Sequence, residues 1–199
     1  MLLLATRNKH KLKEYQFLLK DTNITLTAPD QVKSIPKNFD VQETGKTFQQ
    51  NAILKAKGFG QKANFLTIAD DTGLCIDYLN GQPGIKSARL FNRDFNKAKK
   101  HLLQLLKVVP KSKRTAQFVC ALALFNPKTN QTKVFTGTAQ GYITTKEIGN
   151  KGFHYDTIFY SKKLKKTYAQ ATNIEKNKVS HRTKAFKKLI KYIKLHPYG

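Results

Sequence analysis

Acidic residues are scarce in this chain. Twelve Asp and Glu stand against 37 Lys and Arg among 199 residues, so the formal net charge is +25. Such a surplus indicates a polyanionic partner, which could be a nucleic acid, an anionic membrane surface or a phosphorylated small molecule. The lysines are spread along the whole length, however, whereas a dedicated nucleic-acid arm would concentrate them. Charge alone leaves two interpretations open: a polyanionic partner, or solvated basic faces without such a role.

Cysteine is scarcer still, and long apolar runs are missing. Only Cys75 and Cys120 occur, both in apolar stretches, and we expect them to be buried thiols. No Cys/His cluster has the spacing of metal ligands, which argues against zinc. The leucines that follow Met1 are too few for a signal peptide, and no stretch approaches the length of a membrane span. We therefore expect a reduced, cytoplasmic protein that does not enter a membrane.

The remaining composition is that of a folded globular protein. Hydrophobic residues make up 40% and charged residues 25% of the chain. The length suits one substantial α/β core, or two lobes that share a sheet. Neither an internal repeat nor a low-complexity linker interrupts it, so we interpret residues 1–199 as a single domain.

Hydrophobic spacing predicts strands that alternate with helices in the first half of the chain. Strands are expected at residues 1–5, 24–28, 65–69 and 74–79. The first helix would begin after a cap at Thr6 and turn an inner stripe toward the core. That stripe consists of Leu12, Tyr15, Leu18 and Leu19. A second helix is expected around residues 52–63, and residues 80–84 have the chemistry of a turn.

The second half predicts a helix over residues 95–109, ended by Pro110, and then a long hairpin. Residues 118–125 are continuously apolar, which indicates a strand buried on both faces. A turn at residues 126–130 leads to a partner strand at 133–144. Ser180 would cap a last helix, whose inward-facing residues would be Ala185, Phe186, Leu189, Ile190 and Ile193. These elements predict an α/β fold with a mixed sheet, part parallel and part antiparallel.

A polar segment at residues 6–11 joins the first strand to the first helix. Backbone N–H groups at a helix N-terminus favour an anion, and Lys11 adds a positive charge beside them. The same residues also suit an ordinary, solvated helix start. Phosphate binding there is one of two open interpretations.

Two adjacent acids, Asp70 and Asp71, follow a predicted strand in a chain that has few carboxylates. Magnesium needs hard oxygen ligands, and Glu43 could supply another from the loop before the second helix. Neighbours on a regular strand point to opposite faces, so both acids serve one site only if the strand has already ended, which Gly73 permits. The pair could equally cap a turn.

Two later segments could recognise a nucleobase. Residues 153–156 combine aromatic rings with a carboxylate on a glycine-flanked loop, which suits a base that is stacked and read at its edge. His181 and Arg182 begin the last helix, and with Lys176 they could hold acceptor oxygens. An aromatic anchor under a loop and a basic helix start are the plainer interpretations.

Taken in order, these motifs resemble the inosine/xanthosine triphosphate pyrophosphatase family. The matching patterns are T-x-N-x-x-K at residues 6–11, T-F-x-x-N-A at 47–52, A-D-D-[ST]-G-L at 69–74, G-x-P-G-x-x-S-A-R at 81–89 and K-x-x-x-S-H-R at 176–182. The third and fourth patterns form one long, irregular block that chance rarely produces. The resemblance covers nearly the whole chain.

This resemblance implies a fold, an activity and a partner. The fold would be an elongated mixed β-sheet flanked by helices, in two lobes with a central substrate cleft, usually as a homodimer. The activity would be magnesium-dependent hydrolysis of non-standard purine nucleoside triphosphates (ITP, dITP and XTP) to the monophosphate and pyrophosphate, which cleans the nucleotide pool. Nucleic acid would not be required.

The resemblance also implies roles for individual residues. Glu43 and Asp70 would hold Mg²⁺, and Asp70 would also activate the attacking water. The other implied residues would bind or support the substrate, from its phosphates to its base. They are Thr6, Arg7, Asn8, Lys9, His10, Lys11, Lys55, Asp71, Thr72, Phe153, His154, Tyr155, Asp156, Lys176, His181 and Arg182.

Two positions depart from the family pattern F-G-[YW]-D-P. His154 stands where the family has glycine, and Thr157 stands where it has proline, so the conformation of this loop and the base preference are in question. A family member often has an acid at the position of Gln42 as well. Two other functions stay open: a septum-formation (Maf-like) nucleotide pyrophosphatase with another base preference, and a basic nucleic-acid-binding protein, which would leave residues 81–89 unexplained.

Overall fold

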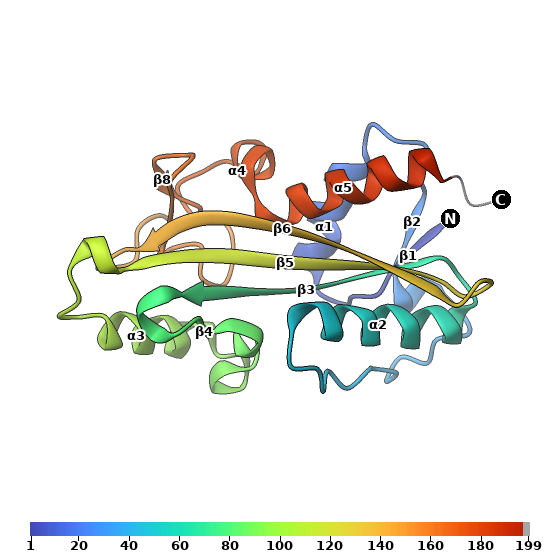
Figure 1. The fold of residues 1–199 in the computed structure, drawn as a ribbon, viewed down its shortest axis with the longest axis horizontal. Coiled ribbons are helices and arrows are strands. Elements are labelled where there is room, and N and C mark those ends of the chain that lie inside the picture. The colour runs from blue at the N-terminus through green and yellow to red at the C-terminus, as the bar shows by residue number, and fades with distance from the viewer. Residues whose placement is uncertain (197–199) are drawn as a thin grey trace. The chain divides into compact units, whose positions relative to one another are not determined.

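The computed structural model describes residues 1–196 and contains one mixed sheet of eight strands with helices packed on it (Figure 1). The strand order is β2-β1-β3-β5-β6-β7-β8, and β4 pairs with β3. The strands are β1 (Leu2–Leu4), β2 (Leu26–Thr27), β3 (Thr67–Ile76), β4 (Gln82–Pro83), β5 (Thr115–Asn126), β6 (Gln131–Ile143), β7 (Phe159–Ser161) and β8 (Lys166–Thr167). The helices are α1 (Lys9–Leu19), α2 (Phe48–Ala63), α3 (Phe95–Leu105), α4 (Asn173–Val179) and α5 (His181–Leu195).

The sheet is mixed, as predicted. β1 runs parallel to β2 and to β3, whereas β3–β4, β6–β7 and β7–β8 are antiparallel pairs. Parallel pairing near the N-terminus follows from the βαβ order of its elements, because the chain must cross over the sheet between parallel strands. Short connections join the antiparallel pairs β3–β4 and β7–β8, whereas residues 144–158 connect β6 to β7.

The chain divides into two compact units. The first consists of Met1–Asp71, Cys120–Thr136 and Ala185–Gly199, and the second consists of Thr72–Val119 and Gly137–Lys184. The elements β3, β5, β6 and α5 each pass from one unit into the other. We describe each unit by itself.

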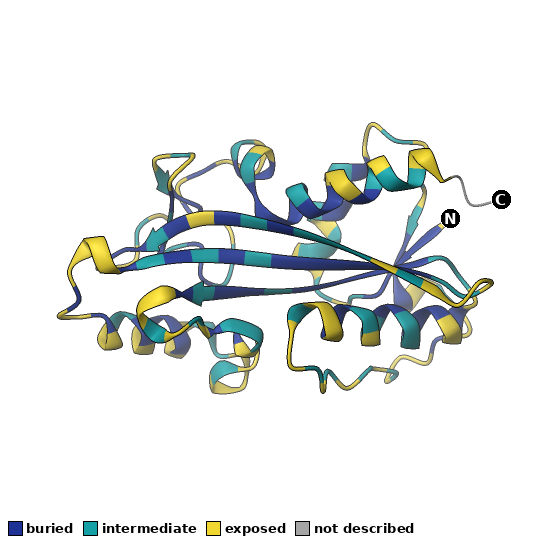
Figure 2. Ribbon diagram, viewed as in Figure 1, coloured by how far each residue is buried: buried dark blue, intermediate teal, exposed yellow. Residues whose placement is uncertain are grey.

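In the first unit, β5 is buried on both faces. Cys120, Leu122 and Leu124 belong to a cluster with residues of α1 and α5, and the residues between them belong to a second cluster with α2. This alternation confirms the strand predicted from the apolar run, and it appears as the dark segment of β5 in Figure 2. The inner stripes predicted for α1 and α5 pack into the first of these clusters.

In the second unit, α3 and the segment after β6 cover one core. Leu102 and Leu106 pack with Leu74 and Ile76 of β3, and Phe118 of β5 packs with the rings of the later segment. Of the two cysteines, Cys120 is buried as expected, whereas Cys75 is half-buried, and no disulfide joins them.

The structure corrects three predictions of element boundaries. The strands predicted at 65–69 and 74–79 are a single strand, β3, which runs through both acids. The predicted cap Thr6 is wrong, because Asn8 caps α1 and its Oδ1 accepts from the backbone N–H of His10. α3 ends at Leu105 rather than at residue 109. Two of these errors involve side chains from other segments, which reach the acids of β3 and a carbonyl oxygen at the end of α3, whereas the cap of α1 is a local contact.

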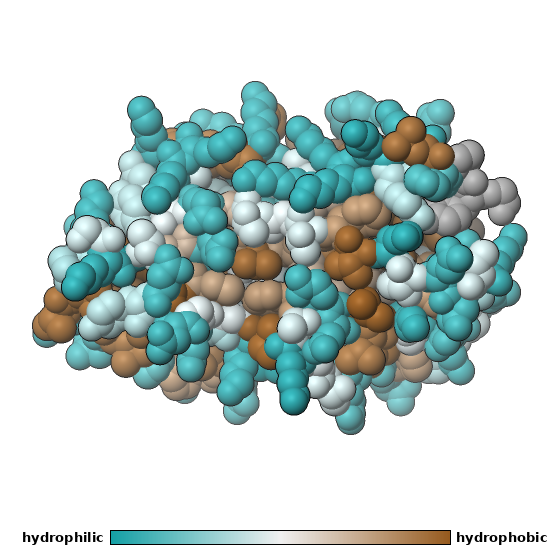
Figure 3. Space-filling model, viewed as in Figure 1, coloured by the Kyte–Doolittle hydropathy of each residue, from teal (hydrophilic) through white to brown (hydrophobic). Residues whose placement is uncertain are grey.

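Hydrophilic side chains are scattered over the face shown in Figure 3, which agrees with lysines distributed along the whole sequence. None of the helices among residues 1–196 combines the length and the apolarity needed to cross a bilayer.

A buried guanidinium holds the C-terminal end of α3. Arg114 is 3% exposed, and it donates to the carbonyl oxygens of Val109 (2.8 Å), Thr144 (3.0 Å) and Leu106. We expect Arg114→Met to lower the free energy of unfolding by about 2–4 kcal/mol, because buried carbonyls would lose their donor. Urea denaturation measures this, with the exposed neighbour Lys113→Met as the control. An equal effect of both substitutions would contradict the assignment.

Candidate active site

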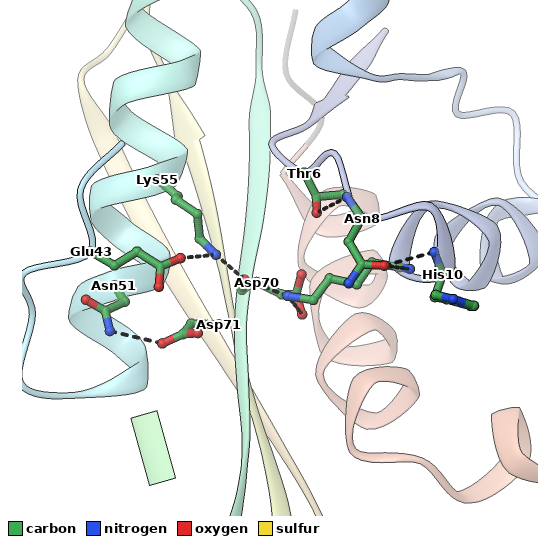
Figure 4. Close-up of polar contacts among 9 residues, drawn as sticks. Thr6, Asn8, His10, Glu43, Asn51, Lys55, Asp70 and Asp71 are labelled. Atoms are coloured by element: carbon green, nitrogen blue, oxygen red, sulfur yellow. Dashed lines mark hydrogen bonds and ion pairs between the residues drawn. The ribbon is translucent and has the colours of Figure 1, made fainter. Parts of the chain in front are cut away.

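Two lysines converge on Asp70 in the first unit (Figure 4). Lys11 Nζ, from α1, lies 3.0 Å from Asp70 Oδ2 and 3.4 Å from the Asp70 carbonyl oxygen. Lys55 Nζ, from α2, donates to the same carbonyl oxygen at 2.8 Å and lies 2.7 Å from Glu43 Oε1. Segments that are far apart in sequence therefore meet at one point of β3.

The pleat of β3 separates the two acids. Asp71 Oδ2 accepts from Asn51 Nδ2 of α2 at 3.1 Å. In Figure 4 the Asp71 carboxylate lies on the side of Glu43 and Asn51, whereas the Asp70 side chain points toward the start of α1. The strand does not end before these residues, so the acids diverge as neighbours on a regular strand must.

Asn51 is a site residue that the sequence prediction missed. Its Oδ1 also accepts from the backbone N–H of Gly45 at 2.8 Å, so one buried amide ties Asp71 to the loop before α2. The signal was present, because Asn51 is the asparagine of the T-F-x-x-N-A motif. A polar residue at a fully buried helix position needs a partner, and this requirement could have identified it.

The corner is rich in negative charge despite the basic composition of the chain. Asp70 and Asp71 are 1% and 8% exposed, and burial raises the pKa of Asp71, which the attraction of Lys55 offsets only in part. Burial alone would lower the pKa of Lys55, but Glu43, Asp70 and Asp71 together raise it. Lys55 is therefore held as a cation among three carboxylates.

The same corner suits a hard divalent cation by its donor chemistry. Three carboxylates lie near two ammonium groups, with Asp70 on one side of β3 and Glu43 and Asp71 on the other, and all three offer hard oxygen atoms. Within residues 1–196 there is no ready-made group of three His, Cys, Asp or Glu ligands around one point. Magnesium in phosphate-handling sites commonly uses only one or two carboxylates and takes its other ligands from water and the substrate, so a larger cage is not needed.

The residues of the motif at positions 6–11 make different kinds of contact. Asn8 caps α1, and Thr6 Oγ1 accepts from the Asn8 backbone N–H at 3.2 Å. Lys9 and His10 are exposed on the first turn. The Arg7 side chain is turned to another segment, where it bonds to Asp30 Oδ1 (3.0 Å) and to the carbonyl oxygens of residues 36 and 39. Of the cations in the motif, the structure brings Lys11 to Asp70.

In the second unit, a buried ion pair organises the loop predicted to meet a base. Lys176 Nζ lies 2.7 Å from Asp156 Oδ2, which also accepts from the Phe153 backbone N–H at 2.9 Å. Lys176 Nζ also lies 4.4 Å from the centroid of the Phe153 ring. Lys176 and Asp156 are 4% and 3% exposed. A capping box between Thr172 and Glu175 starts α4 and sets the position of Lys176.

The Tyr155 side chain is buried and supports the loop from inside the second unit. It is 2% exposed, and its hydroxyl donates to the Ser87 carbonyl oxygen at 2.8 Å. Burial raises the pKa of Tyr155 to about 12, so the phenol keeps its proton. Ser87, another residue that the prediction missed, accepts from the Leu74 N–H through its Oγ at 2.9 Å and belongs to the S-A-R motif.

The first turn of α5 is buried in the second unit. Ser180 Oγ accepts from the Thr183 N–H at 3.1 Å, which confirms the predicted cap. The His181 ring stacks on Phe118 with centroids 4.8 Å apart, and Arg182 is 2% exposed. Thr72 is half-buried on β3, next to the paired acids in sequence.

Comparison with known proteins agrees with this arrangement of motifs. Residues 2–192 match the model of the Ham1 family. A dITP/XTP pyrophosphatase of Halalkalibacterium halodurans is 41% identical over 96% of this chain and 97% of its own length, and one of Synechocystis sp. is 43% identical over 95% and 93%. The Ham1 protein of Staphylococcus aureus has the same fold, with a TM-score of 0.85, 36% identity and 97% of each chain covered. A Ham1 protein of Coxiella burnetii superposes with a TM-score of 0.86 at 34% identity, covering 97% and 98%. The chain therefore belongs to the Ham1 family.

Proposed function

We propose that this protein hydrolyses non-standard purine nucleoside triphosphates, such as dITP, ITP and XTP, to the monophosphate and pyrophosphate. The observation that carries the proposal is the corner at Asp70, where Lys11 lies against the carboxylate and Lys55, paired with Glu43, donates to the carbonyl oxygen. Cations beside a buried carboxylate suit a phosphate chain and a positioned water. The names of the relatives point to the same substrates.

The corner would hold the phosphates. Lys11 and Lys55 would neutralise their oxygens, and the start of α1 at Asn8 offers backbone N–H groups to the same anion. Glu43 and Asp70 would hold Mg²⁺, which when bound neutralises negative charge on phosphate oxygens. The hard oxygen donors and the surplus of carboxylates over lysines support this choice of metal.

Asp70 would orient or deprotonate the water that attacks the α-phosphorus, with pyrophosphate as the leaving group. Lys11 Nζ lies 3.0 Å from Asp70 Oδ2, and this contact would orient the carboxylate. Asp71, held by Asn51, would support the geometry from the other side of β3.

The base would be read in the second unit. Phe153 offers a half-buried ring, while Lys176, His181 and Arg182 supply donors suited to a purine 6-oxygen. An adenine amino group would present a donor to these donors and leave them unpaired, which is how a polar site rejects an analogue. Lys9 and His10 would make peripheral contacts at most, because they are exposed on the first turn, whereas the half-buried Thr6 would lie beside the phosphates.

Membership in the Ham1 family favours this function over that of the septum-formation class. The scattered lysines also favour it over a dedicated nucleic-acid-binding protein. We further propose that the protein acts as a homodimer, which the family resemblance supports. We also propose that it works in the reduced cytoplasm, which agrees with its two cysteines not forming a disulfide. Light scattering in solution tests the dimer.

A panel of nucleoside triphosphates tests the proposed reaction. With Mg²⁺ present, we expect ITP, XTP and dITP to release pyrophosphate at least about 100-fold faster than ATP, since unpaired donors penalise adenine strongly. With Mg²⁺ withheld by a chelator, release should fall to background. Orthophosphate as the product, or equal rates for ATP and ITP, would overturn the assignment.

Replacement of the central carboxylate tests the role of Asp70. Asp70→Asn should lower kcat for ITP by a factor on the order of 10² to 10⁴, because the amide cannot accept the proton of the water. Circular dichroism should show an unchanged fold. Asp21→Asn, in the loop after α1, is the matched control and should keep full activity. Near-normal turnover of Asp70→Asn would remove this residue from the mechanism.

Replacement of Arg182 tests base reading. Arg182→Ala should raise KM for ITP roughly 10-fold or more and should raise KM for ATP less, because only the 6-oxygen accepts a hydrogen bond from the guanidinium. Arg182→Lys keeps a donor and should lie between the two. An equal rise for both nucleotides would mean that Arg182 does not read the base.

A further inference from the structure

The loop that carries Phe153 and Asp156 departs from the family pattern at His154 and Thr157. Both departures make specific contacts within the second unit. His154 contacts α3 directly, and Thr157 contacts it through Glu147. The two residues that the family pattern lacks thus attach the loop to the same helix.

His154 stacks on the first residue of α3. Its ring is nearly parallel to that of Phe95, with an angle of 10° and centroids 3.6 Å apart. The backbone of His154 has φ +55°, a left-handed conformation that explains the glycine of the family pattern. Among other residues, histidine and asparagine enter this region more readily than most. The ring therefore gains a stacking contact at a position where glycine would offer none.

Thr157 replaces a proline and uses the hydroxyl that proline lacks. Thr157 Oγ1 donates to Glu147 Oε2 at 2.7 Å, and Glu147 pairs with Lys99 of α3. The Lys99 side chain is 10% exposed, so the ion pair is anchored at a largely buried end. The Thr157 carbonyl also accepts from the Ile148 N–H at 2.9 Å, which fixes the backbone at the end of the loop.

The stacked histidine also contacts the ring proposed to hold the base. The rings of His154 and Phe153 meet edge to face at 85°, with centroids 4.7 Å apart. Lys176 Nζ lies over the Phe153 ring, and Asp156 binds the Phe153 N–H. A Cβ atom at Gly152 would lie 2.2 Å from Asp156 Oδ2, so the close approach of this carboxylate requires glycine before Phe153.

We propose that His154 and Thr157 are positioning residues that tie the base-binding loop to α3, and that His154, through Phe153, sets how tightly the purine ring is held. The effect on purine binding rests on the proposed function, whereas the attachment of the loop to α3 does not depend on it. We expect an effect on base binding and not on the phosphate chemistry, because the contacts of His154 and Thr157 lie in the second unit, whereas Lys11, Lys55 and Asp70 belong to the first.

Substitutions at both ends of the stack test this proposal. His154→Asn tolerates the left-handed backbone but removes the ring, Phe95→Leu removes the other ring, and His154→Phe keeps a ring at the position. We expect each of the first two to raise KM for ITP roughly three- to ten-fold, the range that one aromatic pair represents, with kcat changed less than about twofold. The double variant should raise KM by clearly less than the product of the two single effects, because both substitutions remove the His154–Phe95 stack, while the contacts of His154 with Phe153 and of Phe95 with Tyr155 are lost in one variant each. His154→Phe should restore most of the affinity.

Phe91→Leu is the matched control. Phe91 also pairs edge to face with a histidine in the same unit, but that histidine, His101, belongs to α3 and not to the loop, and Phe91 is exposed. Its KM should stay within about twofold of the wild-type value. Additive effects of His154→Asn and Phe95→Leu, or unchanged KM values for both, would overturn the proposal.

Hydrogen exchange gives a readout that does not depend on the activity. In His154→Asn the amides of Phe153 and Asp156 should exchange at least about fivefold faster than in the wild type, while the amides of α2 in the first unit should not change. Unchanged exchange would overturn the anchoring. Faster exchange with an unchanged KM would overturn the link to base binding. If the wild-type protein released pyrophosphate from no purine triphosphate, the proposed function would fail, and the exchange data alone would decide the anchoring.

Discussion

The continuity of β3 through two buried carboxylates is the constraint on which the site depends. A buried charge is costly unless other charges and hydrogen bonds satisfy it. Lys11 and Lys55 reach Asp70 from α1 and α2, and Asn51 reaches Asp71. The strand can therefore continue where its sequence suggests a break, and the groups that stabilise it are the ones suited to a phosphate chain. The side chains that stabilise the strand are therefore also the ones proposed to act on the phosphate chain.

The surplus of lysine has structural uses besides any partner. Lys184 and Lys188 of α5 donate to the carbonyl oxygens of Thr138 and Thr136 on β6. β6 pairs with β7 only from Gly141 onward, so these ammonium groups satisfy part of an otherwise open strand edge. Lysine at a strand edge also discourages pairing with another chain. Part of the +25 net charge thus maintains the fold, and hydrophilic side chains are spread over the face shown in Figure 3.

The motif residues are of two kinds, and sequence patterns do not distinguish them. Lys11 and Asp70 offer charged atoms at a shared point, whereas Tyr155 and Ser87 are bonded to each other inside the second unit. Arg7 lies in the opening motif, yet it fastens a separate loop through Asp30. A motif preserves both the reacting groups and the groups that hold them, because misplacing either one changes the geometry of the site.

The sequence by itself determined the family, the mixed sheet, the apolar faces of α1, β5 and α5, and the set of segments from which the site is drawn. Periodic burial and motif spacing are local properties, so one dimension suffices to identify them. Only the tertiary structure decided that β3 is unbroken, that Asn8 caps α1, and that Asn51 and Phe95 take part. The cap at Asn8 is local, but a motif with two possible caps does not say which one is used. The other outcomes depend on partners twenty or more residues away, and such long-range contacts leave no periodic pattern in the sequence.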